Sequence, residues 1–441
     1  MDVDIPPVPP YEIVESYHIE YGNHPQIASN LTLISPYNLI SMSPESFANS
    51  LRSIVAQGLA KIPIAGFFLS ALEQLLWPVS GQDIWGMIKD QVEALVNEKI
   101  AKFQYELVKE DLQGLQRVIN DYKDSLKFAK ENPEFVREKY LIAIGFFQDQ
   151  LPHFIAEGQE LPLLGLYASF ANLHLATLRD GVLFGKEWGW QPDLVKAQHD
   201  KLVEAIKEHT EWVSKWYKKG LEETKQGLPT TGNNLTTNRW AIVNRYERNM
   251  TLNILDLQFY WPYFDPEVAP PGKKDAIPTL TRMIYSDPIG TFEDNGIPDL
   301  TPVMDLLVAL GLRGFANLDA IQETFIDKTG GIYTTPWIGG TGGELNPPWG
   351  WSGHFDGNLI VGVRGHSGDI INSIILEFKD GSSTPRVGNN EGPIYGNAFH
   401  YTYPGHLMTK MFANGPSRYY DSLEGIILGF RPEEAYKGFP R

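Results

Sequence analysis

The chain has 441 residues, a formal net charge of −17 and no cysteine. The negative charge argues against a nucleic-acid partner, because phosphate binding needs clustered Lys and Arg, and against electrostatic docking on anionic lipid. The lack of cysteine excludes a disulfide scaffold, a thiolate metal site and a cysteine nucleophile. The length and ordinary globular composition allow two or three domains, each with a sizeable core.

The first 42 residues are rich in Pro, Asn and Ser, and they predict an irregular N-terminal arm. The chain starts MDVDIPPVPPYEIVE, which is acidic and Pro-rich. A secretory signal peptide would instead be basic and then apolar. We therefore expect a protein without a signal peptide, which would leave its cell by lysis or a non-classical route.

A helical pattern begins at Ser43 and continues for over 200 residues. Ser43-Pro44-Glu45-Ser46 combines an N-cap, a proline at the first helical position and an early acidic residue. Six or more amphipathic helices around one that is apolar on all sides predict a bundle of about seven helices. The expected helices are 43–59, followed by a second apolar piece that ends at Pro78, two within 82–130, 133–157, 161–184, 191–225 and 238–260.

The segment 161–178, LPLLGLYASFANLHLATL, runs for eighteen residues without Asp, Glu, Lys or Arg. A helix from Leu161 to Phe184 would be about 36 Å long, enough for the roughly 30 Å hydrocarbon core of a bilayer. Such a helix must be buried in protein or in lipid. Pro162, Asn172 and His174 favour the centre of a bundle, with His174 a buried, hydrogen-bonded core residue. Both environments are compatible if the helix leaves the bundle and later enters a membrane.

The character of the sequence changes after Pro270-Pro271-Gly272, where Gly and Pro become frequent. Short alternating segments such as NLIVGVRG and IINSIILEFKDG predict strands. A repeat is visible, with starts 53 and then 49 residues apart: Asp319-Ala320-Ile321, Asn372-Ser373-Ile374 and Asp421-Ser422-Leu423, each with a later Phe. Three related units predict an all-β domain with approximate threefold symmetry.

Catalytic and cofactor motifs are missing from the sequence. GGTGGE at 339–344 resembles a phosphate loop but lacks the following Gly-Lys-Ser/Thr. There is no HExxH, no GxSxG and no GxGxxG before a helix, and the ten His show no metal-ligand spacing. We therefore expect neither an enzyme nor a bound cofactor or metal.

Four blocks carry a family resemblance. PLLGLYASFANLHLATLRDGVLFGKEWG at 162–189 resembles the central-helix signature of the three-domain insecticidal crystal (Cry) toxins of bacteria. Residues 248–265 are similar to the last helix of their pore domain, 280–290 to the junction that follows, and Trp351-Ser352-Gly353-His354 to a motif of the second domain. The match covers about 43–430.

No counterpart of the third, β-sandwich domain of the Cry toxins is found in the sequence. The chain therefore looks like PirB, the larger subunit of the PirAB binary insecticidal toxins, in which the smaller PirA resembles that domain. A Cry toxin that lacks its third domain, or one cut short, is the alternative.

The resemblance implies three parts: the arm 1–42, a seven-helix pore-forming bundle 43–272 and a β-prism receptor-binding domain 273–441. It also implies that the helical hairpin 133–184 enters the membrane. There Glu138, Gln148 and Asp149 would line water, although in the soluble state they would form the solvated face of an outer helix. The candidate inserting residues are Tyr140, Ile144, Phe147, Asp149, Leu151, Leu163, Leu164, Leu166, Tyr167, Phe170, Leu173 and Leu175.

The implied β-prism has the shape of the jacalin-type lectins, so its apex would contact a receptor, such as a glycan. Trp337, Trp349, Trp351 and His354 are the candidates, because exposed Trp beside Gly suits sugar stacking or protein docking. Trp351 fits core packing equally well.

The expected partners are a PirA-like small subunit, host membrane lipid, a surface receptor and further copies of the chain in the pore state. Synthesis in a bacterial cytoplasm, release without a signal peptide and action at a host cell membrane would follow. The alternatives are a lectin-like glycan-binding protein without pore activity and a storage protein.

Overall fold

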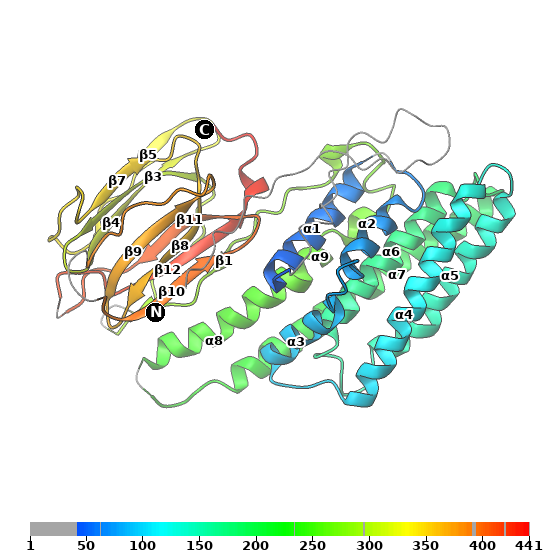
Figure 1. Cartoon of the computed structure of the whole chain (residues 1–441), viewed down its shortest axis with the longest axis horizontal. Coiled ribbons are helices and arrows are strands. Elements are labelled where there is room, and N and C mark those ends of the chain that lie inside the picture. The colour runs from blue at the N-terminus through cyan, green and yellow to red at the C-terminus, as the bar shows by residue number, and fades with distance from the viewer. Residues whose placement is uncertain are drawn as a thin grey trace. The chain divides into compact units, whose positions relative to one another are not determined.

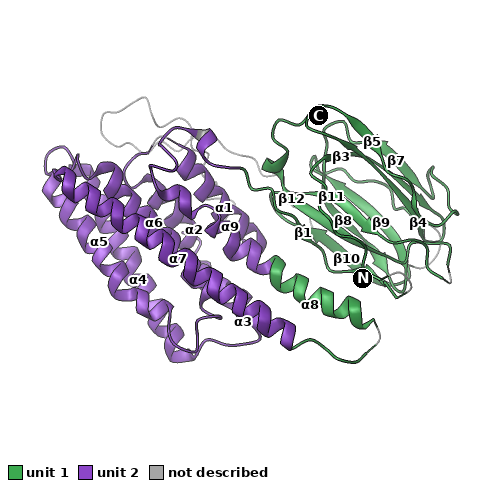
Figure 2. Cartoon of the chain, turned by 180° about the vertical axis from the view of Figure 1, so that it is seen from behind, with its two compact units in different colours: residues 1–11, 227–248, 279–441 green, residues 12–226, 249–278 purple. Residues whose placement is uncertain are grey.

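The computed structural model describes residues 42–61, 63–232, 234–293, 296–389, 394–418 and 420–440, so the predicted arm, apart from Met42, lies outside the described residues. The chain forms two compact units, which Figure 2 colours separately. The helical unit holds the described residues up to Gln226 together with Asn249–Pro278. The β unit holds Gly227–Arg248 and the described residues from Thr279 onward.

The described residues form eight helices if α8 and α9 are counted as one, since a π-helical turn at Thr251–Leu255 joins them (Figure 1). About seven were expected. The number is higher because the second apolar piece forms a short helix of its own, α2. The bounds are α1 Pro44–Ala60, α2 Phe67–Leu76, α3 Ile84–Val96, α4 Lys102–Ser125, α5 Pro133–Phe154, α6 Leu164–Phe184, α7 Pro192–Gln226, α8 Leu235–Met250 and α9 Asp256–Gln258.

Local sequence signals set several helix starts. The Ser43 hydroxyl accepts a hydrogen bond from the backbone N–H of Ser46 at 3.2 Å, and Pro44 is the first helical residue, as predicted. Asn132 caps α5 in the same way. These side chains satisfy backbone donors that have no partner inside the helix.

Helix α6 occupies the centre of the helical unit, which confirms the predicted arrangement. Every residue from Leu161 to Gly181 is buried, and α6 contacts α2, α3, α5 and α7. The helix begins at Leu164 rather than at Leu161, because the preceding residues form a turn. Its 21 residues span about 32 Å.

The β unit contains three antiparallel sheets, in agreement with the predicted β-prism. Each sheet is built around one long hairpin: β3–β4, β8–β9 or β11–β12. The first sheet has β1 Ile284–Tyr285, β2 Ile289–Gly290, β11 His406–Ala413 and β12 Gly425–Pro432. The second has β3 Leu306–Gly314, β4 Leu318–Ile326, β5 Ile332–Thr334, β6 Ile338–Gly339 and β7 Trp351–His354. The third has β8 Ile360–Ser367, β9 Ile371–Phe378 and β10 Asn397–Thr402.

The three predicted repeats meet at one end of the β unit. The backbone N–H of Leu423 donates to the carbonyl of Leu318 at 2.9 Å, and that of Ile371 donates to the carbonyl of Leu423 at 3.2 Å. The Ser422 hydroxyl also donates to the Asp319 carboxylate at 2.8 Å. Each repeat therefore starts within a hairpin strand or just before one. Hydrogen bonds join the three starts around a common centre.

We predict that Ile374→Ala in β9 lowers the free energy of unfolding of the β unit by about 2–5 kcal/mol, because this fully buried side chain would leave a cavity. The matched control is Ile332→Ala in β5, where the side chain is 64% exposed and the change should stay within about 0.5 kcal/mol. Guanidinium unfolding followed by circular dichroism measures both. Equal effects of the two substitutions would contradict the repeat-centred core.

Candidate functional site

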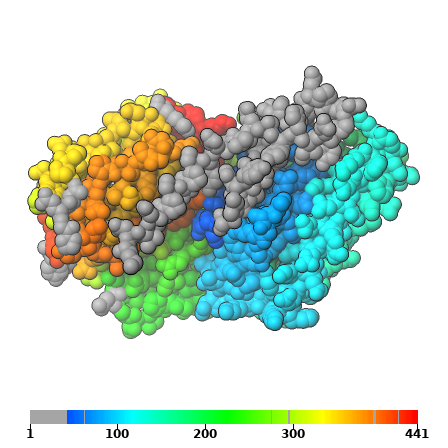
Figure 3. Space-filling view, viewed as in Figure 1, coloured from blue at the N-terminus to red at the C-terminus, as the bar shows by residue number. Residues whose placement is uncertain are grey.

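Helices α5 and α6 form an antiparallel hairpin joined by residues 155–163. Aromatic rings hold the two helices together: Phe170 of α6 lies 5.2 Å from Phe147 and 4.3 Å from Phe154, measured between ring centroids. The opposite face of α5 is exposed, and the cyan surface of the helical unit in Figure 3 belongs to α4 and α5. One member of the hairpin is therefore amphipathic and the other is enclosed.

The structure brings the candidate inserting residues together along this hairpin. Asp149 is exposed with Glu138 and Gln148, and Leu151 is half-buried. The remaining candidates are buried: Tyr140, Ile144, Phe147, Leu163, Leu164, Leu166, Tyr167, Phe170, Leu173 and Leu175. The polar residues of α5 thus form the solvated face of an outer helix in this state.

One expectation about α6 is wrong. Among the described residues, no helix combines the length and the apolar character needed to cross a membrane. The helix starts three residues later than expected, and Asn172, His174 and Thr177 interrupt its apolar surface before the charged pair Arg179-Asp180. Burying those polar groups in lipid on every side would cost free energy. In a membrane, α6 therefore needs protein or water beside them.

Two buried histidines join α6 to α7. Nδ1 of His174 lies 3.1 Å from Nε2 of His209, and Nδ1 of His209 lies 2.7 Å from the hydroxyl of Tyr167. Burial lowers the pKa of His174 to about 4 and also lowers that of His209. Both rings are therefore neutral at neutral pH, and the prediction that His174 is a buried, hydrogen-bonded core residue is confirmed.

The charged pair at the end of α6 fixes this helix to three other segments. The Asp180 Oδ2 accepts hydrogen bonds from the Gly66 backbone N–H at 2.7 Å and from the Tyr122 hydroxyl at 3.0 Å. Burial raises the pKa of Asp180 to about 7, although these two donors oppose the shift. Arg179 donates to the backbone carbonyls of Tyr263 and Phe264 at 3.0 and 2.8 Å.

The four receptor-binding candidates have separate surroundings in the β unit. The guanidinium of Arg313 lies 4.3 Å from the ring centroid of the half-buried Trp337. Trp351, also half-buried, lies on β7 at 6.2 Å from Phe378, while His354 at the end of that strand is exposed. Trp349 packs against Phe315, at the end of the unit where the repeats meet.

That end carries exposed aromatic residues that the sequence interpretation missed. Phe315, in the β3–β4 turn, is 52% exposed and lies 4.4 Å from Trp349. Tyr420 in the β11–β12 connection is 52% exposed, and Tyr395 just before β10 is 61% exposed. We call Phe315, Trp349, Tyr395 and Tyr420 the aromatic end. Exposure of each ring depends on turn geometry, which the sequence pattern does not give.

The glycine-rich loop 339–343 binds a carboxylate of the chain itself. The backbone N–H of Thr341 lies 3.0 Å from each Asp421 carboxylate oxygen, and that of Gly342 donates to Oδ2 at 2.8 Å. Gly339 and Gly343 adopt positive φ values of 120° and 75°, which glycine tolerates. These donors lower the pKa of Asp421. The loop that resembled a phosphate site is thus occupied by a side chain of the third repeat.

Comparison with known sequences identifies the class. Residues 54–265 match the family model of the delta endotoxin, N-terminal domain. The pesticidal crystal protein Cry1Id of Bacillus thuringiensis is 34% identical over 342 residues, which cover 72% of this chain and 44% of Cry1Id. Cry26Aa of Bacillus thuringiensis subsp. finitimus is 34% identical over 250 residues, 54% of this chain and 20% of that protein. The chain is therefore a relative of the Cry-type insecticidal toxins, and it spans less than half the length of these relatives.

Solved structures extend the similarity into the β unit. The insecticidal delta-endotoxin Cry8Ea1 of Bacillus thuringiensis aligns with a TM-score of 0.70 and 22% identity, over 88% of this chain and 73% of that chain. PirB aligns with a TM-score of 0.69 and 16% identity, over 91% of this chain and 97% of that chain. The fold is thus PirB-like, as the sequence resemblance predicted. Cry1Id and Cry26Aa are both pesticidal crystal proteins.

We predict that the histidine pair makes the helical unit sensitive to acid. Below about pH 6.5 the unfolded chain binds a proton on His174, whereas the folded chain does not until near pH 4, so stability falls as the pH drops across this window. Burial also lowers the pKa of His209, which adds to the loss in the same direction. The loss due to His174 should reach about 3 kcal/mol. Urea unfolding of wild type and His174→Gln/His209→Gln at pH 7, 6, 5 and 4 measures it.

The double variant should show a smaller decline than wild type over this range. His354→Gln, at an exposed position, serves as the control and should follow wild type. Parallel pH profiles for wild type and the double variant would contradict a role for the pair.

We predict the opposite dependence for Asp180. Its pKa is raised by burial, so between about pH 4 and 7 the unfolded carboxyl loses its proton first and folded stability falls as pH rises. Asp180→Asn keeps an oxygen for both donors, since both bonds end on Oδ2. The variant should therefore gain up to about 4 kcal/mol over wild type by pH 8. Asp149→Asn, at an exposed position, is the control. If the free energy of unfolding of Asp180→Asn differed from that of wild type by the same amount at pH 4 and pH 8, the assignment would be refuted.

Proposed function

We propose that this chain is a pore-forming insecticidal toxin subunit that binds a host gut-cell receptor and inserts the α5–α6 hairpin into the membrane. The observation that supports it best is the hairpin itself: a fully enclosed helix paired with an amphipathic one, inside a bundle of the delta endotoxin type. Such a helix is unstable at a protein surface in water, but it can enter a membrane where other helices or water cover its polar groups.

A hairpin is a suitable unit for insertion because the backbone groups of both helices remain hydrogen-bonded in the bilayer. In the inserted state Glu138, Gln148 and Asp149 would face a water-filled lumen. Asn172 and His174 would lie between neighbouring helices, since α6 is not apolar enough for lipid on every side. The proposal therefore requires several copies of the chain around one pore.

The contacts that must break before the hairpin leaves the bundle include three sets on α6. They are the His174–His209 bond to α7, the Asp180 bonds to Gly66 and Tyr122, and the Arg179 bonds to the segment after α9. All three sets involve residues of α6. The helix that would enter the membrane is therefore also the helix whose contacts keep the hairpin in the bundle.

The aromatic end of the β unit is our proposed receptor surface, because exposed aromatic rings suit sugar stacking or protein docking. On the likeness to PirB, we also propose a PirA-like small subunit as partner. Synthesis in a bacterial cytoplasm, release from that cell and action at the host cell membrane complete the proposal.

The test is dye release from neutral and gut-derived lipid vesicles, before and after limited trypsin treatment, with and without a PirA-like subunit. Asp121→Cys/Lys139→Cys, whose parent side chains lie 3.6 Å apart on α4 and α5, allows a reducible bis-thiol crosslink that retains the hairpin. The chain has no native cysteine, so only the introduced pair reacts. We expect the crosslink to abolish release and reduction to restore it.

The matched control is Thr324→Cys/Thr334→Cys, which joins β4 to β5 where the two hydroxyls lie 2.9 Å apart. This crosslink should leave dye release unchanged. Release from the locked hairpin at the wild-type rate would overturn the proposed insertion. No release under any condition, with the partner present, would favour a glycan-binding protein without pore activity.

A further inference from the structure

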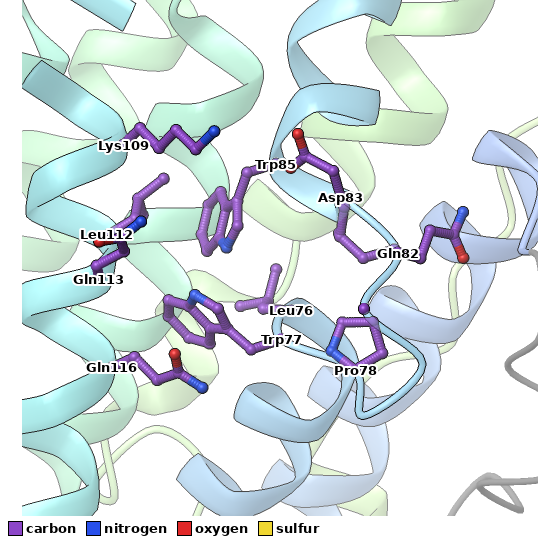
Figure 4. Close-up of a pocket in the computed structure, with 12 residues that line it drawn as sticks. Leu76, Trp77, Pro78, Gln82, Asp83, Trp85, Lys109, Leu112, Gln113 and Gln116 are labelled. Atoms are coloured by element: carbon purple, nitrogen blue, oxygen red, sulfur yellow. The ribbon is translucent and has the colours of Figure 1, made fainter. Parts of the chain in front are cut away.

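A pocket of about 330 Å³ lies in the helical unit, between the α2–α3 connection and α4 (Figure 4). None of its residues belongs to the hairpin or to the aromatic end. Its lining comes from the end of α2, the connecting loop, the start of α3 and one face of α4: Leu76, Trp77, Pro78, Gly81, Gln82, Asp83, Ile84, Trp85, Lys109, Leu112, Gln113 and Gln116.

Two tryptophans form the aromatic part of the pocket. The rings of Trp77 and Trp85 lie 5.2 Å apart, measured between centroids, at an angle of 55°. Trp77 is half-buried, whereas Trp85 is only 6% exposed and its indole N–H has no hydrogen-bond partner among the described residues. Figure 4 shows both indole nitrogens turned toward the space between the rings. A buried donor without an acceptor is unfavourable, and a ligand oxygen at this place would satisfy it.

Helix α4 supplies polar groups that are available to a ligand. Lys109, Gln113 and Gln116 are spaced four and three residues apart, so they share one face of the helix. Figure 4 shows Gln116 reaching toward Trp77 and Lys109 extending above Trp85. Within the described ranges, no hydrogen bond or ion pair engages these three side chains, in contrast to the loop residues opposite.

The loop side of the pocket is already committed to the fold. The amide of Gln82 exchanges two hydrogen bonds with the backbone of Met42, at 2.9 and 2.8 Å. The Asp83 carboxylate accepts from the backbone N–H of Gly86 at 2.9 Å and so caps α3. The loop therefore holds one wall rigidly, and α4 provides the adaptable donors and acceptors.

We propose that this pocket binds a neutral sugar ring. An aromatic face accepts the C–H face of a sugar, and amide side chains both donate to and accept from its hydroxyls. Charge argues against an anion, because the single ammonium of Lys109 lines the pocket together with the carboxylate of Asp83. Unpaired amides argue against a purely apolar ligand. The volume falls in the range of small-molecule sites.

The test uses the full chain with D-galactose, D-mannose, N-acetylgalactosamine and N-acetylglucosamine, each at millimolar concentration. Saturation-transfer NMR detects contact, and titration calorimetry gives Kd. We expect at least one sugar to bind with Kd on the order of 1 mM, and Trp77→Ala or Gln113→Ala/Gln116→Ala to weaken it about tenfold or more. Phe103→Ala, at a 79% exposed position on α4 outside the pocket, is the control and should leave this binding unchanged. Trp349→Ala reports separately on sugar binding at the aromatic end of the β unit.

Binding that persists in Gln113→Ala/Gln116→Ala, or that disappears only in Trp349→Ala, would overturn the assignment of this pocket. Absence of transfer for all four sugars would overturn it as well. Phosphocholine serves as a charged competitor, and tighter binding of phosphocholine than of any sugar would also refute a neutral ligand. Dye release is measured separately, so failure of the sugar site and failure of the pore proposal are distinguishable.

Discussion

Keeping α6 away from water is the constraint on which the helical unit depends. All of its residues as far as Gly181 are buried, so each surrounding helix must turn an apolar face toward it. That requirement explains why α5 and α7 are amphipathic and why aromatic rings such as Phe147 and Phe154 gather on Phe170. A helix enclosed in this way is stable only while its neighbours stay in place.

The polar residues of α6 make this enclosure specific. A purely apolar helix could rotate or slide among its neighbours, whereas His174, Arg179 and Asp180 each have partners at fixed positions. Burial lowers the pKa of His174 and raises that of Asp180, so stability falls with acid through the histidine and with rising pH through the carboxyl group. The contacts of His174 and Asp180, which help to retain α6, are thus sensitive to proton concentration.

The β unit depends on a different constraint, because it must hold three similar hairpins together. Backbone hydrogen bonds between the repeat starts, together with the Ser422–Asp319 bond, fix the centre. The loop 339–343 then binds Asp421 from the third repeat. With the centre fixed, the turns project aromatic rings such as Phe315 and Tyr420 into solvent. The helical unit has its own solvent-facing site, the pocket of Trp77 and Trp85.

The sequence by itself determined the two-part architecture, the central position of α6 and the three repeats, because helical periodicity, capping and strand alternation are local properties of the chain. Only the tertiary structure decided that His174 meets His209, that Asp180 meets Gly66 and that Asp421 fills the glycine-rich loop. These partners are separated by 35, 114 and about 80 residues. Their meeting depends on how each helix is rotated and which loops converge. The same reason separates Trp337, Trp349 and Trp351, which one short stretch of sequence had placed together.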